Sequence, residues 1–300
     1  MDRRAYIYAF LAAVLWASTA ATVKLLLEGL DALQVLLFTS LFATASLLAI
    51  TAAQGKLSLL RKHSMKDYWR FSWMGALGVF AYSTLLFGAL QRSTAQEAFI
   101  INYTWPLWMV ILAMPLLKER FNTRKAIALL AGFAGVYLVA TQGGFLMPRT
   151  ENLYGNLLAL AAAFCYGLFS VLGKRHDDDK TTSMLIYFTT TLILSFAAVL
   201  TFSNIPTLNP AQWAGLLWLG VFATALPFIS WFLALKHGDV SAMSSVVFLT
   251  PFMSLIYIYF LLEEPIHLSS ILGLGLITAG ILLQPRTARY HQKKKGPRNW

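Results

Sequence analysis

Long uninterrupted apolar segments constrain the fold of this chain more than any other feature. They recur along all 300 residues in blocks of about 20, the length at which an α-helix crosses the hydrocarbon core of a bilayer. Only 12% of the residues are charged, whereas soluble domains carry about 25%, so there is too little charge to cover a soluble surface of this size. The sequence therefore predicts an all-α integral membrane protein without a separate soluble domain.

Apolar length and turn signals divide the chain into ten expected transmembrane helices. The apolar stretch that follows the basic N-terminus is too long for the core of a signal peptide, so we expect it to be the first span. The expected spans cover about 5–27, 33–53, 69–91, 94–117, 124–142, 153–174, 183–203, 211–236, 240–262 and 267–284.

The distribution of basic residues predicts the orientation of these spans. A net charge of +11 would suggest nucleic-acid binding in a soluble protein. Here, however, 21 of the 24 Lys and Arg residues fall at the N-terminus, in every second loop and in the C-terminal tail, and only Arg92 and Arg149 fall on the opposite side. Because basic loops stay on the cytoplasmic side, we expect both termini to be cytoplasmic and expect no nucleic-acid partner.

The two halves of the chain resemble each other when the sequence is shifted by 145 residues. Five spans per half is an odd number, so the second half must be inverted relative to the first, an architecture of many secondary transporters. We therefore expect two inverted five-helix repeats, 1–145 and 146–300, the second including the basic tail; an accidental match in a channel or a membrane enzyme is the alternative. The shift aligns Pro106 with Pro251, Glu119 with Glu264, and Ala134-Gly135 with Ala279-Gly280.

The sequence contains no constellation of residues that is typical of an enzyme. The five histidines lie in loops, at span ends or in the tail, without the spacing of metal ligands, and no ATP-binding motif occurs. The single cysteine, Cys165, forms neither an intrachain disulfide nor a zinc site, and we interpret it as a packing residue. We expect no catalysis, no cofactor and no metal.

The charged residues within or near the spans predict how transport is gated and driven. No carboxylate falls at the centre of a span, and Glu97 lies near the outer end of the fourth one, which favours a facilitator or weak ion coupling. Lys24 is interpreted either as a lysine that snorkels to the interface or as an outer-gate partner of Glu97 or of a substrate carboxylate. Lys174 would be its pseudo-symmetric counterpart.

Polar and aromatic residues in the middle of apolar spans predict the substrate site, because lipid offers them no hydrogen-bond partner. The segment Ile101–Trp108, INYTWPLW, is the densest cluster, although anchoring at the interface explains Trp108 almost as well. Pro106, Pro227 and Pro251 are expected to interrupt their helices and to act as hinges. The predicted substrate-binding residues are Trp16, Tyr82, Asn102, Tyr103, Trp105, Tyr166, Trp231, Ser244, Ser245 and Phe248.

The repeat with its Pro106–Glu119 and Pro251–Glu264 pairs resembles the drug/metabolite transporter superfamily, EamA type. The string Asn102-Tyr103-x-Trp105-Pro106 is similar to the YddG subgroup, which comprises aromatic amino acid exporters of bacterial inner membranes. The resemblance implies export by alternating access from a central cavity, lined by spans one to four and six to nine. Small multidrug exporters carry a glutamate in their first helix, but this chain has Trp16 and no acid there, so their proton exchange cannot be carried over.

These observations predict a multi-pass transporter of the bacterial inner (plasma) membrane that exports aromatic or other neutral apolar amino acids and related metabolites. Its partners would be a small-molecule substrate and the lipid bilayer. An exporter of other metabolites or of drug-like cations is the alternative within the same class, and a non-transporting membrane scaffold or sensor is the alternative outside it. The sequence leaves open the resting conformation and the oligomeric state.

Overall fold

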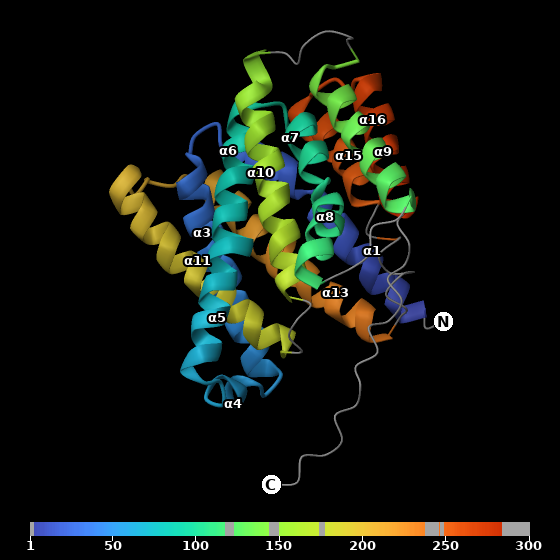
Figure 1. The fold of residues 1–300 in the computed structure, drawn as a ribbon. Coiled ribbons are helices and arrows are strands. Elements are labelled where there is room, and N and C mark those ends of the chain that lie inside the picture. Colours follow the sequence, from blue (N-terminus) through green and yellow to red (C-terminus); the bar gives the residue numbers. More distant parts are fainter. Residues whose placement is uncertain are drawn as a thin grey trace.

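The structure is a computed structural model that describes residues 3–117, 123–143, 150–173, 178–237, 246 and 249–283. Every regular element in this part of the chain is a helix, and the helices run in long, roughly aligned segments (Figure 1). The expectation of an all-α fold is therefore confirmed for the described residues.

The first half of the chain forms α1 (Arg3–Ala17), α2 (Thr19–Leu26), α3 (Ala32–Ala53), α4 (Leu57–Leu60), α5 (Met65–Gly75), η1 (Ala76–Ala81), α6 (Tyr82–Arg92), α7 (Ala95–Asn102), α8 (Trp105–Leu117) and α9 (Thr123–Ala140). The second half forms α10 (Thr150–Gly173), α11 (Lys180–Phe202), α12 (Pro210–Leu217), η2 (Trp218–Ala225), α13 (Leu226–His237), α15 (Thr250–Leu262) and α16 (Leu268–Leu283).

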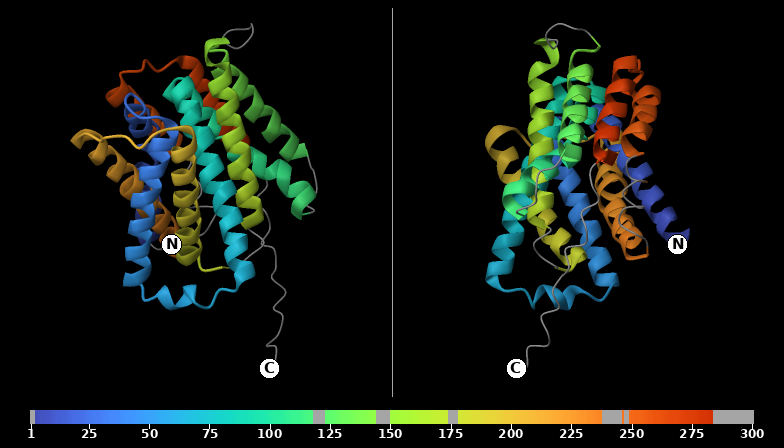
Figure 2. Two further views of the ribbon diagram at one scale, coloured as in Figure 1. Left: turned by 90° about the vertical axis from the view of Figure 1, so that its left-hand side faces the viewer. Right: turned by 45° about the vertical axis from the view of Figure 1, so that its right-hand side comes forward.

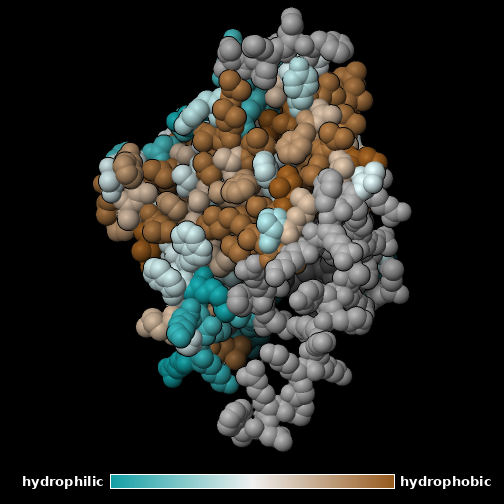
Figure 3. Space-filling model, viewed as in Figure 1, coloured by the Kyte–Doolittle hydropathy of each residue, from teal (hydrophilic) through white to brown (hydrophobic). Residues whose placement is uncertain are grey.

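Seven helical segments of the described chain are long and apolar enough to cross a membrane. They coincide with seven of the predicted spans, whereas the predicted spans 124–142, 240–262 and 267–284 fall on shorter apolar helices. Apolar side chains cover the middle of the face drawn in Figure 3, and hydrophilic ones gather at its lower end, over α4 and α5. The structure thus agrees with a multi-pass membrane protein, and ten crossings stay a prediction.

Local sequence signals fix the beginnings of several helices. Asp31 accepts hydrogen bonds from the backbone of the first turn of α3, Ser64 does so for α5, and Asn209 does so for α12. In each case the third helical residue bonds back to the capping residue, which satisfies backbone donors that would otherwise have no partner.

Two long helices widen midway into π-helical turns. The turn η1 joins α5 to α6, and η2 joins α12 to α13, so each interrupts a span near its centre. Such wide turns are frequent at functional sites because they displace the side chains of the following turn.

The three prolines expected to interrupt helices occupy equivalent places in the structure. Pro106, Pro227 and Pro251 are each the second residue of a helix, namely of α8, α13 and α15. In α8 and α15, which follow non-helical residues, the missing N–H would lack an intrahelical partner anyway, so proline is tolerated. Pro227 instead lies just after η2 within a continuous helical segment. The helix is interrupted at Tyr103 and Thr104, and this interruption separates α7 from α8 within the fourth predicted span.

Helices of the first half pack against helices of the second half. The most extensive contacts join α9 to α16, α3 to α11, α6 to α10, and α1 to α13. The views in Figures 1 and 2 show α9 and α16 side by side at one edge of the molecule, and α4 crossing one end between α3 and α5. The two halves are therefore interleaved along their whole length.

Two ion pairs fasten the connection at the α4 end to the start of α11. Lys56 contacts Asp179 at 2.7 Å, and Arg70 contacts Asp178 at 2.8 Å. Burial opposes the ionisation of Asp179, but hydrogen bonds from Lys56 and Thr182 outweigh it and lower the pKa of this carboxyl. Asp178 and Asp179 therefore tie the start of α11 to Lys56 and to Arg70 of α5.

Glycine lets α9 and α16 approach closely. A Cβ atom added to Gly135 would lie 2.6 Å from the carbonyl oxygen of Gly273, and one added to Gly273 would lie 2.8 Å from the carbonyl oxygen of Gly135. The side chains of Ile277 and Val139 also lie close, but because backbone atoms block both positions, moving a side chain alone would not relieve the clash. Small residues at such crossings are the usual means by which membrane helices pack tightly.

We predict that Gly135→Ala lowers the free energy of unfolding by about 1–3 kcal/mol, because the added methyl group overpacks the crossing. The control is Gly275→Ala on α16, where an added Cβ meets no atom within 4 Å. Both variants gain the same helix propensity, so the difference between their free energies of unfolding measures the effect of the added methyl group at the crossing of α9 and α16. Thermal unfolding of the purified protein in detergent measures both; equal midpoints would contradict the close packing.

Candidate functional site

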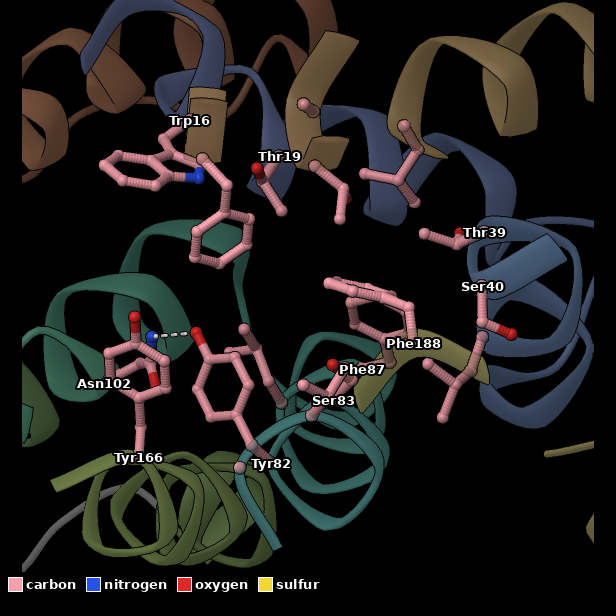
Figure 4. Close-up of a pocket in the computed structure, with 18 of the residues that line it drawn as sticks. Trp16, Thr19, Thr39, Ser40, Tyr82, Ser83, Phe87, Asn102, Tyr166 and Phe188 are labelled. Carbon is pink, nitrogen blue, oxygen red and sulfur yellow. Dashed lines mark hydrogen bonds between the residues drawn. The ribbon is translucent and has the colours of Figure 1, made fainter. Parts of the chain in front are cut away.

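A cavity of about 280 Å³ lies in the middle of the helix bundle, among α1, α3, α6, α7, α10, α11 and α13 (Figure 4). Its volume is near the lower end of the range of small-molecule sites, about 300–1,000 Å³. Seven predicted substrate-binding residues line it, namely Trp16, Tyr82, Asn102, Tyr103, Trp105, Tyr166 and Trp231. The structure thus brings them together, and their role in binding stays a prediction. Ser244, Ser245 and Phe248 lie outside the described residues.

Asn102 supplies the most polar group of the cavity lining. It ends α7 just before the break in the fourth span, and only 2% of its surface is exposed. Its amide nitrogen donates a hydrogen bond of 3.2 Å to the hydroxyl of Tyr82, whereas its carbonyl oxygen has no partner among the described residues (Figure 4). A buried acceptor without a partner costs free energy, so this oxygen is well suited to accept a bond from a bound molecule.

Aromatic rings form two opposite walls of the cavity. On one wall the ring of Tyr166 lies 4.9 Å from that of Tyr82 and 5.1 Å from that of Trp105. On the other wall Trp16 lies 5.4 Å from Phe228 in an edge-to-face arrangement and 6.4 Å from Trp231. These walls can hold a flat apolar group between them.

Several lining residues were not predicted from the sequence. The small polar ones are Thr19, Thr39, Ser40, Ser83 and Thr224, and the aromatic ones include Phe188 and Phe228. Ser and Thr are common in membrane helices because their hydroxyls bond to the carbonyl of the preceding turn, as Ser40 does with Leu37. A hydroxyl that faces a cavity therefore leaves no separate signal in the sequence.

Trp108, which had two interpretations, does not line the cavity. Its ring packs edge-on against Phe133 of α9 and Phe164 of α10, at 6.0 and 5.4 Å. It therefore provides a natural comparison for Trp105, which lies one turn earlier on the same helix and does line the cavity.

Glu97 lies at the centre of a buried polar network at one end of the cavity. Its side chain is 2% exposed and accepts bonds from Gln142 (2.7 Å), Asn156 (3.0 Å) and Asn152 (3.2 Å), and a longer one from Ser93. On α7 it precedes Asn102 by five residues, which is about 7.5 Å along a helix. The network thus links α7 to the end of α9 and to the first turns of α10.

A second set of bonds ties the start of α7 to the connection between α15 and α16. The carboxylate of Glu264 accepts bonds from the backbone nitrogens of Ala95 and Gln96 at 3.0 and 3.4 Å. The Gln96 side chain donates to the carbonyl of Pro265 and accepts from the hydroxyl of Ser270. A carboxylate at a helix N-terminus is favoured by the helix dipole as well as by these bonds.

Lys24 donates to the carbonyl oxygens of Leu90 and Ser93, both at 2.7 Å. Within the described residues it forms no ion pair with Glu97, and the carboxylate that acts on it electrostatically is Glu264. The structure therefore places Lys24 beside the network and not in a direct pair with Glu97. Lys174, its expected counterpart, lies outside the described residues.

The described residues contain no group of three or more His, Cys, Asp and Glu side chains that could hold a metal ion. None of the described lining residues of the cavity carries a formal charge, since its polar groups are hydroxyls, indoles and the Asn102 amide. The site therefore offers shape, aromatic surface and a few hydrogen bonds rather than ionic contacts.

Comparison with known proteins identifies the family. The model of the EamA-like transporter family matches residues 3–141 and again residues 153–284. This chain belongs to the EamA-like transporter family. It is therefore a membrane transporter, and the family resemblance expected from the sequence is confirmed.

Several relatives and a solved structure resemble this EamA-like transporter over most of its length. An uncharacterized transporter of Archaeoglobus fulgidus is 26% identical over 97% of this chain and 100% of its own. The aromatic amino acid exporter YddG of Ancylobacter novellus is 28% identical over 82% of this chain and 84% of its own. A crystal structure of a protein 24% identical superposes with a TM-score of 0.70, covering 94% of this chain and 96% of that one, which supports the fold.

In this EamA-like transporter we predict that Tyr82→Phe lowers the free energy of unfolding by about 1–3 kcal/mol, because the buried Asn102 amide loses its only described acceptor. Tyr166→Phe is the control, since the Tyr166 hydroxyl bonds to no described residue although its ring lies in the same wall. Chemical or thermal unfolding in detergent compares the two. If both variants lose equal stability, the Asn102–Tyr82 bond has no special role.

Proposed function

We propose that the protein exports aromatic or other neutral apolar amino acids and related metabolites by alternating access through the central cavity. The observation that carries this proposal is the charge-free cavity between two aromatic walls, with the unpartnered oxygen of Asn102 beside them. Similarity to an aromatic amino acid exporter of Ancylobacter novellus supports the same substrate class. Aromatic walls would hold the side chain, and the amide and hydroxyls would hold the polar end.

We further propose that two inverted five-helix repeats, 1–145 and 146–300, form the ten-span bundle. The separate family matches to 3–141 and 153–284 support this division. Helix packing supports it too, since the pairs α6–α10 and α1–α13 exchange under the repeat, as do the π-helical turns η1 and η2. Inversion would give each side of the membrane a similar set of helix ends, as alternating access requires.

We propose that the α4 end and both termini lie on the cytoplasmic side of a bacterial inner membrane. The uneven distribution of Lys and Arg supports this orientation, because Lys56, Arg61, Lys62 and Lys66 all cluster around α4. The end that carries Glu97 and Glu264 would then face outward. The polar network around Glu97 would be the outer gate, closed in this structure, and the proline-led helices α8, α13 and α15 would be the hinges.

The cavity also favours a facilitator over a strongly coupled carrier. Proton coupling commonly uses a carboxylate at the substrate site, and the described lining contains none. Glu97 is the buried carboxylate closest along α7, but its oxygens are already engaged by amide donors. Export would then follow the amino acid gradient.

We predict that Trp105→Ala lowers phenylalanine flux in proteoliposomes by about tenfold or more per folded molecule, because it removes part of a cavity wall. Trp108→Ala, one turn away and outside the cavity, should retain flux within about twofold. Size-exclusion chromatography normalises both variants to folded protein, and flux should be unchanged when the proton gradient is collapsed.

An absence of flux for every amino acid in a panel of aromatic and aliphatic ones would contradict the proposed substrate class. An equal loss of phenylalanine flux in both tryptophan variants would instead show that Trp105 has no special role in binding, without contradicting the transport activity.

The outer gate predicts a second result, measured by thiol accessibility. In a Cys165→Ala background, Ser83→Cys places a single reactive group in the cavity lining. Adding Glu97→Gln should raise its labelling by a membrane-impermeant reagent applied to intact cells about fivefold, because charge-assisted bonds that close this end are weakened. Glu151→Gln, an exposed glutamate in the first turn of α10, is the matched control. Equal labelling in both backgrounds would rule out a gate at Glu97.

A further inference from the structure

The described lining of the cavity lacks a group that would pair with a carboxylate. Its described lining contains no Lys, Arg or His, and the sequence between residues 238 and 248 contains none either. Lys24 is the basic residue inside the first span, and its ammonium group is already bonded to the carbonyls of Leu90 and Ser93. A carboxylate in this cavity would therefore be held only by neutral donors, which compensate poorly for the loss of water.

The same lining favours a positive charge. The faces of aromatic rings carry negative partial charge and attract ammonium groups, and Trp16, Tyr82, Trp105 and Tyr166 line the cavity with such rings. The carbonyl oxygen of Asn102 is a buried acceptor with no partner among the described residues. It lies beside this aromatic group, because the amide bonds to Tyr82 and the ring of Tyr82 lies 4.9 Å from that of Tyr166.

We propose that the cavity recognises the ammonium group and the apolar side chain of its substrate, and that it does not recognise the carboxylate. Asn102 is the specificity-determining residue, accepting a hydrogen bond from the ammonium group with its Oδ1 atom while the rings surround the charge. The substrate class therefore extends from aromatic amino acids to arylalkyl amines and to amino acids with a blocked carboxylate. This inference rests on the proposed function, because it concerns the same cavity and the same transported molecules.

Ammonium recognition predicts the order of affinity of four ligands that share one phenyl ring. Phenethylamine keeps the ammonium group and lacks the carboxylate, and phenylalanine amide keeps the ammonium group with a neutral end. Phenylalanine carries both charges, and hydrocinnamate carries only the carboxylate. Affinity should fall in the order phenethylamine and phenylalanine amide, then phenylalanine, then hydrocinnamate.

The test measures binding and not flux, because neutral amines cross bilayers unaided. Ligand-dependent thermal stabilisation of the purified full-length protein at neutral pH gives a dissociation constant for each of the four compounds. Phenethylamine should bind about tenfold more tightly than phenylalanine, as expected from removing an unpaired carboxylate, and hydrocinnamate at least about tenfold more weakly. Binding of hydrocinnamate as tight as that of phenethylamine would overturn the proposal.

Variants locate the recognition at Asn102. Asn102→Leu, of similar volume, should reduce the affinity for phenethylamine about tenfold and leave that for hydrocinnamate unchanged. Asn102→Asp keeps the acceptor oxygen and adds a negative charge, so it should strengthen the binding of amines. This second variant provides the test if Asn102→Leu does not fold. Trp108→Phe, outside the cavity, is the control and should leave all four affinities unchanged.

The outcomes separate this inference from the proposed function. Flux of phenylalanine together with an equal or weaker affinity for phenethylamine overturns ammonium recognition and leaves amino acid export in place. Tight binding of the amines without flux of any amino acid supports ammonium recognition and overturns the proposed amino acid substrates. A loss of affinity in Asn102→Leu that is equal for amine and acid assigns this residue to packing and also overturns the proposal.

Discussion

Water is absent from the core of a bilayer, so each polar group in these helices has to find its partner within the protein. Most Ser and Thr side chains meet this constraint locally, by bonding to a carbonyl of their own helix, as Thr191 does with Tyr187. Glu97 meets it through amide donors from two other segments, the end of α9 and the first turns of α10. Among the buried polar groups without a partner in the described chain, the Asn102 oxygen and the Thr39 hydroxyl line the central cavity, whereas others, such as the Ser254 hydroxyl, lie elsewhere in the bundle.

The constraint also separates two kinds of polar chemistry along the bundle. Charged groups collect in the network around Glu97, Glu264 and Lys24, where each has several fixed partners. The described cavity lining carries no charge, although Asn102 lies only about one and a half helical turns from Glu97 along α7. A fully bonded network can hold the bundle closed, while a neutral aromatic cavity leaves its few free groups to a ligand. The two roles therefore do not compete for the same side chains.

Sequence patterns predicted the cavity residues that are conspicuous in an apolar helix. Trp16, Asn102 and Tyr166 stand out in midspan because lipid cannot satisfy them, and the structure brings them to one place. Thr39 and Ser40 went unnoticed because hydroxyls are unremarkable in membrane helices.

Hydrogen-bond partners that come from distant segments of the chain could not be predicted from the sequence either. A pair with Lys24 was one of the interpretations offered for Glu97, but Gln142, Asn152 and Asn156 surround it. The packing of α7 against both α9 and α10 brings these amides together. The π-helical turns η1 and η2 left no recognisable sequence signal either.

Two interruptions of the helices lie next to the walls of the cavity. An interrupted helix exposes backbone groups, which a membrane protein tolerates only where they are buried in protein or line a cavity. The interruption before Pro106 directly follows Asn102 and lies beside Trp105, and the one before Pro227 precedes Phe228 and Trp231. Each wall of the cavity thus includes a ring on a segment that follows an interruption of its α-helix. In the proposed mechanism, a rotation of either segment about this interruption would move part of an aromatic wall, so the proposed binding and closure would depend on the same few backbone positions.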